Sequence, residues 1–320
     1  MRLIWLNVKT YKIDFSVGPF ERYLDKTLFI KRVFQAHVGV IDQDKTKLAE
    51  VIREVLYSSA ELTPGKLHST RIPQKGVAVL WEQTPITSGY ASEVVFSSEH
   101  FPCDLDLLEK YGSKIVIYES QFKLKFDKLY YPIFKTIFEK RFASKYSKEV
   151  LLYNVGLNVI TYELSKQLHK FTGARERLKE LYGPIDEANG FASGIEHCKH
   201  LLVKGLISQE ELEAIMIIHI LWMFADWLVY THNKAKESHV IGNSILLNAY
   251  LTNGALKVSG GISWPNFSKI FFEIESMAYQ LVQVLQQGSY NDAKKFIKKN
   301  ANLKNFEILG KSLKGLPTTL

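Results

Sequence analysis

The chain has 320 residues, of which 46% are hydrophobic and 23% charged, so it can bury one large core or two smaller ones. Its two cysteines, Cys103 and Cys198, lie too far apart to indicate a disulfide framework, which favours a reducing compartment. The net charge of +8 comes from dispersed lysines with mild clustering near the C-terminus, and no nucleic-acid motif accompanies it. We therefore expect a cytoplasmic protein that does not bind nucleic acid.

No membrane-spanning segment is expected. The apolar run at the N-terminus is interrupted by Asn7 and Lys9, so it resembles neither a signal peptide nor a span. The most apolar stretch, "IMIIHILWMFADWLVY", contains His219 and Asp226 and is short for a span. We interpret it as a buried core helix.

Residues 1–126 are expected to form a β-rich lobe. They contain alternating β-branched and aromatic runs, separated by Gly, Pro, Ser and Asp, a pattern typical of strands and turns. A single helix is expected over 44–59, where the apolar residues recur at helical spacing. The predicted strands cover 11–18, 34–42, 76–83, 92–99 and 113–120.

Residues 127–320 are expected to form an all-helical lobe. Helical periodicity begins near Phe126, and Ser208 followed by Glu211 predicts a capping box. The stretch 255–264 is expected to be a loop or small hairpin. The predicted fold class is α+β, with a cleft between the two lobes. The predicted helices cover 126–142, 147–171, 184–204, 208–232, 239–251, 267–287 and a short segment from 291.

Polar residues gather on two consecutive predicted helices. Tyr162, Glu163 and Lys166 lie within one turn of each other, and Asp186 and Glu187 begin the next helix. By spacing alone this pattern is typical of amphipathic helices, in which Glu163 and Lys166 form a surface ion pair. Residue spacing therefore does not separate a structural role from a functional one.

Several motifs, taken in order, resemble the bacterial branch of the dipeptidyl peptidase III family. The chain reads "YELSKQLH", then "RERLKELYGPIDEANGF", then "ESHVIGNSILLNAYLTNGALK". Upstream, "IDFSVGPFERYLDKTLFIKRVFQAHVGV" and "KYGSKIVIYE" are similar to further segments of that branch. The resemblance covers nearly the whole chain and implies a β-rich lobe followed by a helical lobe of the zincin-like peptidase type. Full-length family members are longer at the N-terminus.

The resemblance also implies roles for the residues of the polar cluster. Tyr162 and Lys166 stand where the two zinc-binding histidines of the family belong, and neither is a credible zinc ligand at neutral pH. Glu163 matches the glutamate that activates water, and Glu187 matches the carboxylate ligand, with Asp186 beside it. Zinc-dependent peptidase activity is therefore not expected, nor is a bound metal or other cofactor.

Other positions of the family pattern are altered or kept. His239 matches a histidine that the family uses near the substrate, and Asn243 follows it by one turn and is expected to line the cleft. Asn189 and Phe191 replace a lysine and an aspartate of the family pattern, so the surroundings of the site have changed as well.

The loss of the metal has a physical consequence. Without a dication, Glu163 and Glu187 would repel each other, which raises a pKa or separates the helices. An ammonium group between them removes the repulsion. We therefore expect Lys166 to replace the charge of zinc and to pair with both carboxylates, while Tyr162 donates its hydroxyl to the same cluster.

The sequence leaves three functions open. The first is a non-peptidase that binds a peptide or small molecule in the inter-lobe cleft. The second is a metal-independent acid–base enzyme, in which Glu163, His239 and Tyr162 transfer protons and Lys166 stabilises charge. The third is a peptidase whose metal ligands have moved.

A moved metal site would draw on a histidine-rich segment. Its ligands would be His197 and His200, joined by Glu187 or His169. The structural alternative makes His197 and His200 partly exposed polar residues, Cys198 a core residue and His169 a surface or inter-lobe histidine. The oligomeric state is not predicted.

Overall fold

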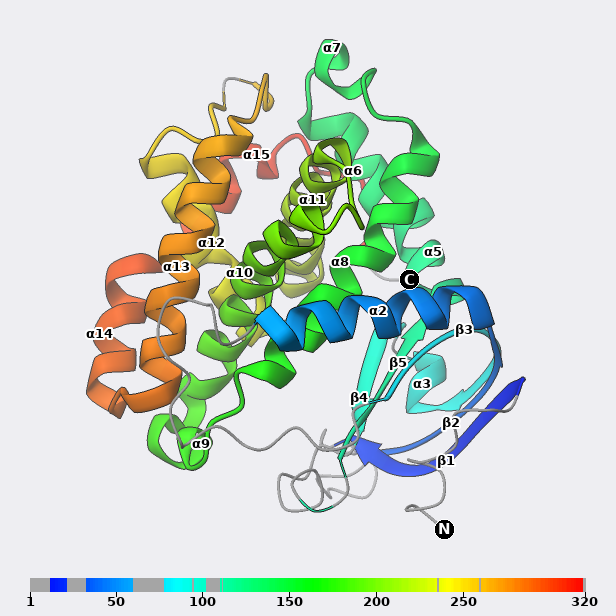
Figure 1. The fold of residues 1–320 in the computed structure, drawn as a ribbon. Helices are drawn as coiled ribbons and strands as arrows, with labels where there is room; N and C mark the ends of the chain where they lie inside the picture. The colour runs from blue at the N-terminus through cyan, green and yellow to red at the C-terminus, as the bar shows by residue number, and fades with distance from the viewer. Residues whose placement is uncertain are drawn as a thin grey trace. The chain divides into compact units, whose positions relative to one another are not determined.

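The computed structural model describes residues 12–21, 33–59, 78–93, 95–101, 110, 112–234, 236–258 and 260–318. The chain forms two compact units (Figure 1). The first comprises Met1–Glu54 and Ile72–Lys125, and the second comprises Val55–Arg71 and Phe126–Thr319.

The first unit is built on a five-stranded sheet with the strand order β1-β2-β3-β5-β4. Neighbouring strands are antiparallel except β3 and β5, which are parallel. Strand β5, between β3 and β4, consists of consecutive buried residues rich in Ile and Val, as expected of a strand covered on both faces. The strands are β1 (Ile13–Glu21), β2 (Val33–Ile41), β3 (Ala78–Gly89), β4 (Ser98–Phe101) and β5 (Lys114–Tyr118).

One long helix, α2 (Gln43–Ser59), forms where the sequence predicted a helix. Its residues up to Glu54 belong to the first unit and are hydrogen-bonded to β3. Thr46 Oγ1 accepts a hydrogen bond of 3.1 Å from Trp81 N, and Glu50 Oε1 accepts one of 3.2 Å from Val79 N. Two short helices complete the unit, α3 (Tyr90–Glu93) and α5 (Glu119–Lys125).

The predicted strand over 92–99 is wrong for its first half. Gly89 ends β3 with a φ of 63°, a conformation that favours glycine. Ser92 Oγ then donates a hydrogen bond of 2.7 Å to Gly89 O, which closes a helical turn. Strand pairing resumes only at Ser98, opposite Ile117.

The second unit is helical in its described residues, so the α+β prediction is confirmed. Ser208 and Glu211 form the predicted capping box at the start of α11. The α-helices are α6 (Tyr131–Ile137), α7 (Lys140–Ala143), α8 (Lys148–Leu168), α9 (Ala174–Leu178), α10 (Tyr182–Val203), α11 (Gln209–Asn233), α12 (Glu237–Thr252), α13 (Phe267–Gln287), α14 (Tyr290–Asn300) and α15 (Glu307–Gly310). A π-helix, η1 (Phe126–Tyr130), and two 3₁₀ helices, η2 (Lys179–Leu181) and η3 (Leu303–Phe306), connect them.

Helix α10 is the central element of the helical unit. It packs against α8, α12 and α13. Glycines permit two of these approaches. A Cβ added at Gly194 would lie 3.0 Å from the backbone nitrogen of Tyr162 in α8. A Cβ at Gly242 of α12 would lie 2.8 Å from the carbonyl oxygen of Pro184. The backbones of α8 and α12 therefore lie unusually close to α10.

The helix predicted over 126–142 is interrupted. It begins as the π-helix η1, continues as α6 and stops at Phe138, which has an extended backbone. The loop before α13 pairs with the chain at this point, because Ile137 O accepts a hydrogen bond of 2.6 Å from Ile262 N and Phe138 bridges to Ile262. No local sequence signal marks this pairing.

Within the described residues, one helical segment, Gln209–His232, is long and apolar enough to cross a membrane. Most of that segment is buried inside the helical unit, where His219 and Asp226 are both almost inaccessible. The expectation of a core helix is therefore met.

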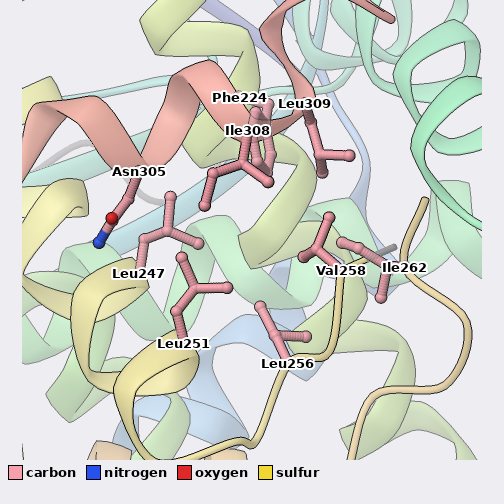
Figure 2. Close-up of a pocket in the computed structure, with 9 residues that line it drawn as sticks. All are labelled: Phe224, Leu247, Leu251, Leu256, Val258, Ile262, Asn305, Ile308 and Leu309. Atoms are coloured by element: carbon pink, nitrogen blue, oxygen red, sulfur yellow. The ribbon is translucent and has the colours of Figure 1, made fainter. Parts of the chain in front are cut away.

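A small apolar cavity lies elsewhere in the helical unit (Figure 2). It encloses about 210 Å³, open solvent at its mouth included. Its walls come from α11, α12, the loop before α13 and the C-terminal helices. None of the predicted site residues lines it. The lining residues are Phe224, Leu247, Leu251, Leu256, Val258, Ile262, Asn305, Ile308 and Leu309.

Candidate functional site

Three helices bring most of the predicted site residues together. Helix α8 carries Tyr162 and Lys166 on adjacent turns, because residues four apart share a helix face. Helix α10 supplies Asp186 and Glu187 from its first turns, and α12 supplies His239 from its first turn. These five side chains form what we call the lysine–carboxylate cluster.

Lys166 holds the cluster together. Its Nζ lies 2.9 Å from Glu187 Oε1 and 3.4 Å from Asp186 Oδ2. The same nitrogen donates a hydrogen bond of 3.1 Å to the hydroxyl of Tyr162. Its side chain is 18% exposed. Burial alone would lower the pKa of Lys166, but the carboxylates and Tyr162 raise it well above its ordinary value, so the ammonium stays charged.

Tyr162 links the lysine to Glu187. Its hydroxyl donates a hydrogen bond to Glu187 Oε2 while accepting one from Lys166. Burial and the negative charge of Glu187 raise the pKa of Tyr162 well above its ordinary value. The hydroxyl is therefore protonated at neutral pH and acts as a donor.

Glu187 is an ionised carboxylate in a largely buried position. Burial alone would raise its pKa, but the charges of His239 and Lys166, with hydrogen bonds from Lys166 and Tyr162, lower it to about 2. His239 Nδ1 lies 3.3 Å from Glu187 Oε2, at ion-pair distance. The side chain of His239 is 27% exposed, which makes it the most accessible member of the cluster.

The glutamate predicted to activate water lies beside this cluster. Glu163 is partly exposed on α8. Its charge helps to raise the pKa of both Tyr162 and Lys166. Asp186 is also at ion-pair distance from Lys166, and the sequence hypothesis did not name this pair.

The residues present do not fit a zinc ion. A zinc ligand must offer a lone pair, and histidine nitrogens and ionised carboxylates do so. At the two histidine positions, Lys166 is a protonated ammonium and Tyr162 is a protonated phenol. The ammonium also contacts Glu187, the carboxylate that the resemblance implies as a metal ligand. Across the described parts of the chain, no group of three or more His, Cys, Asp or Glu side chains could hold a metal ion.

Gly190 leaves space for the side chains of Tyr162 and Lys166. A Cβ at this position of α10 would lie 2.6 Å from Lys166 Cγ and 2.7 Å from Tyr162 Cε2. The lysine stem and the phenol ring therefore pass directly over a glycine. Sequence reasoning missed this residue, although a glycine inside an amphipathic helix signals a close approach.

The ring of Tyr162 packs against two other aromatic rings. The ring of Tyr162 lies 4.6 Å from that of Phe191 and 5.6 Å from that of Trp222. Phe191 also contacts His219, whose pKa burial lowers to about 3. Phe191, which stands where the family pattern has an aspartate, thus forms part of an apolar floor.

Asn243 has a different partner. This buried residue of α12 donates a hydrogen bond of 3.4 Å to Asp226 Oδ2 on α11. Asp226 Oδ1 lies 2.6 Å from Lys236 Nζ. The structure therefore places Asn243 in a second polar group that sequence reasoning did not detect, because its carboxylate lies within an apolar helix.

Two of the histidines considered for a moved metal site are buried. His197 is completely inaccessible and its Nδ1 lies 2.8 Å from Ser165 Oγ, while His169 is 1% exposed. The expectation that His197 is partly exposed is wrong, and His169 does not lie at the surface, whereas His200 is partly exposed as expected. Cys198 is a buried core residue, as expected.

The fold is that of known dipeptidyl peptidases. The structure of dipeptidyl peptidase III from Caldithrix abyssi superposes with a TM-score of 0.87 at 22% identity, covering 99% of this chain and 62% of that one. The structure of dipeptidyl-peptidase III from Corallococcus sp. strain EGB gives 0.83 at 21% identity, covering 99% and 59%.

Sequence comparison gives one weaker and partial likeness. Nudix hydrolase 3 of Arabidopsis thaliana is 21% identical over 303 residues, which is 91% of this chain and 38% of that protein. No family model matches the chain. The chain thus spans less than two thirds of each of these relatives. The full-length superpositions show that this chain has a dipeptidyl peptidase III-like fold, with a β lobe and a helical lobe.

Proposed function

We propose that the chain is a dipeptidyl peptidase III-like protein that works without zinc, does not hydrolyse peptides by a zinc-bound water, and binds a peptide or small molecule. The observation that carries this proposal is the distance of 2.9 Å between Lys166 Nζ and Glu187 Oε1. A permanent positive charge replaces the dication, so the carboxylate remains ionised without a metal. The protein is proposed to be cytoplasmic.

The accessible part of the cluster supports a ligand-binding role. His239 is partly exposed and sits against Glu187, so a ligand reaching the cluster would meet an imidazole first. An amide or carboxylate group can accept or donate hydrogen bonds there. The solved relatives are dipeptidyl peptidases, which makes a peptide the first ligand to test.

A second candidate is metal-free acid–base catalysis. It is favoured by the position of His239, because a partly exposed imidazole in contact with a carboxylate is a common arrangement in general acid–base catalysis. Glu163 and Tyr162 would assist, and Lys166 would stabilise negative charge that develops on a substrate.

The first experiment measures zinc content. Purified protein is incubated with zinc, dialysed and assayed for bound metal, beside the double variant Tyr162→His/Lys166→His. The wild-type chain should retain no stoichiometric zinc, whereas the variant, which regains two nitrogen ligands next to Glu187, should retain it. Stoichiometric zinc in the wild-type protein would refute the proposal.

Ligand binding is then measured by calorimetry with short synthetic peptides of mixed sequence. His239→Ala should weaken binding at least roughly tenfold if the ligand meets the imidazole. Lys148→Ala, a change on α8 at a pair with Asp127, is the matched control and should leave binding unchanged. Turnover of a dipeptidyl-naphthylamide without metal, lost in His239→Ala, would instead establish the acid–base candidate.

A further inference from the structure

The outer strands of the sheet have an inverted pattern of burial. On β1 and β2 the buried side chains include polar and charged ones, whereas large apolar side chains point outward. Asp14 and His37, for example, are 6% and 4% exposed, while Phe15 is 60% exposed. A sheet with one solvated face normally shows the opposite pattern.

The outward apolar residues form one continuous patch, which we call the outer sheet face. Cross-strand pairing joins them, because Ile13 lies opposite Val40, and Val38 lies opposite both Phe15 and Ile86. The exposed fractions are 60% for Ile13, 60% for Phe15, 56% for Val17, 59% for Phe34, 49% for Val40 and 58% for Ile86.

The size and chemistry of this face are unusual for a free surface. Six large apolar side chains, each about half exposed, present on the order of 600 Å² of apolar area, at the upper end of what monomers expose. The other outward positions of β2 and β3 that the structure describes, such as Gln83 and Ser88, are uncharged. Burial of this face would therefore remove no charged side chain of these strands from water.

We propose that the outer sheet face is the interface of a homodimer, in which it packs against the same face of a second copy. The described residues of this face carry no charge, so two copies can meet there without like-charge repulsion when a two-fold axis brings residue i against residue j and residue j against residue i. The exposed apolar area approaches the roughly 800 Å² that each partner buries in an interface of standard size. Two twisted sheets can pack face to face in this way, as in β-sandwiches. This inference concerns a surface of the β unit and does not depend on the proposed function.

The test is sedimentation velocity over a range of protein concentrations. The wild-type chain should associate reversibly to a dimer. Phe15→Lys and, separately, Ile86→Lys place an ammonium at the centre of the interface and should each raise the dissociation constant by roughly 100-fold or more. Both side chains point into solvent in the single chain, so thermal unfolding of the monomer should change little.

Phe272→Lys is the matched control. Phe272 is 67% exposed on α13 in the helical unit, so the same change there should leave the dimer intact. A wild-type chain that stays monomeric at every concentration overturns the proposal. So does a dimer that persists in both sheet variants, or one that is lost in Phe272→Lys, because the contact would then lie elsewhere.

Discussion

At the scale of single residues, Glu187 shows how a carboxylate can stay ionised in a largely buried position. Glu187 is mostly buried, and a buried carboxylate without a partner would be protonated. Lys166 supplies a positive charge and Tyr162 donates a hydrogen bond, so the pKa of Glu187 falls to about 2. Asp186 shares the same ammonium. The charged groups of the cluster therefore stabilise one another, and removal of the Lys166 ammonium should lower the free energy of unfolding.

Replacement of Lys166 tests this interdependence. Lys166→Met keeps most of the stem but leaves Glu187 and Asp186 buried without a cation, so we expect a loss of about 3 kcal/mol in the free energy of unfolding at pH 7. The pKa of wild-type Glu187 is depressed, so its stabilisation is present above about pH 4.5 and is lost as pH falls towards 2. The difference between the two proteins should therefore shrink on acidification.

The measurement is urea denaturation at several pH values. Lys148→Met, at an exposed pair with Asp127, is the control and should lose far less stability. An equal loss in both variants, or a loss in Lys166→Met that does not depend on pH, would contradict the charge-replacement argument.

At the scale of elements, the packing of α8 on α10 sets the geometry of the cluster. Alanine normally favours a helix over glycine by about 1 kcal/mol. Gly190→Ala should nevertheless destabilise the protein by about 1–3 kcal/mol, because its Cβ would lie 2.7 Å from the ring of Tyr162. Thermal unfolding measures the change. A gain in stability would mean that the ring and the lysine stem move aside freely.

The sheet contains a second titratable group in an unusual state. Glu82 of β3 is 1% exposed, and burial, with the nearby charge of Asp14, raises its pKa to about 8. Its Oε1 accepts a hydrogen bond of 3.1 Å from Thr84. The native carboxyl thus keeps its proton at pH values where the unfolded chain has lost it.

This proton makes stability depend on pH. The native state binds more protons than the unfolded state between about pH 4.5 and 8, so the free energy of unfolding should fall by up to roughly 5 kcal/mol as pH rises through that range. Glu82→Gln, which mimics the neutral acid, should flatten this dependence. Glu54→Gln, at an exposed position of α2, should retain it. Urea denaturation at pH 5 and pH 8 distinguishes the variants, and an unchanged slope in Glu82→Gln would refute the assignment.

At the scale of the whole molecule, stability should be independent of metal ions. A ligand that binds only the native state raises the midpoint of thermal unfolding, and its removal lowers it. Because the donor set around Glu187 contains an ammonium and a phenol, neither chelator nor added zinc should change the midpoint of this chain. A drop on chelation would show a metal site that the described residues do not reveal, and the bound metal would then be identified by elemental analysis.

The sequence predicted most elements because their signals are local. Helix α13 runs over Phe267–Gln287 as expected, with Asn266 capping its first turn. The capping box at the start of α11 was likewise predicted from the sequence. Local signals failed where a distant segment intervened. Ile262 pairs with Ile137 where the helix stops, and the turn at Gly89 converts an apolar run into α3.

By itself, the sequence determined the α+β class and the spacing that puts Tyr162 and Lys166 on one face of a helix, since both depend on residue type and order. Only the tertiary structure decided which groups meet. It paired Lys166 with Asp186 as well as Glu187, gave Asn243 to Asp226 and enclosed His197. These outcomes depend on how closely α8, α10 and α12 approach one another. The distances between these helices are set by glycines and by side-chain packing. Neither produces a periodic pattern that can be recognised in the sequence.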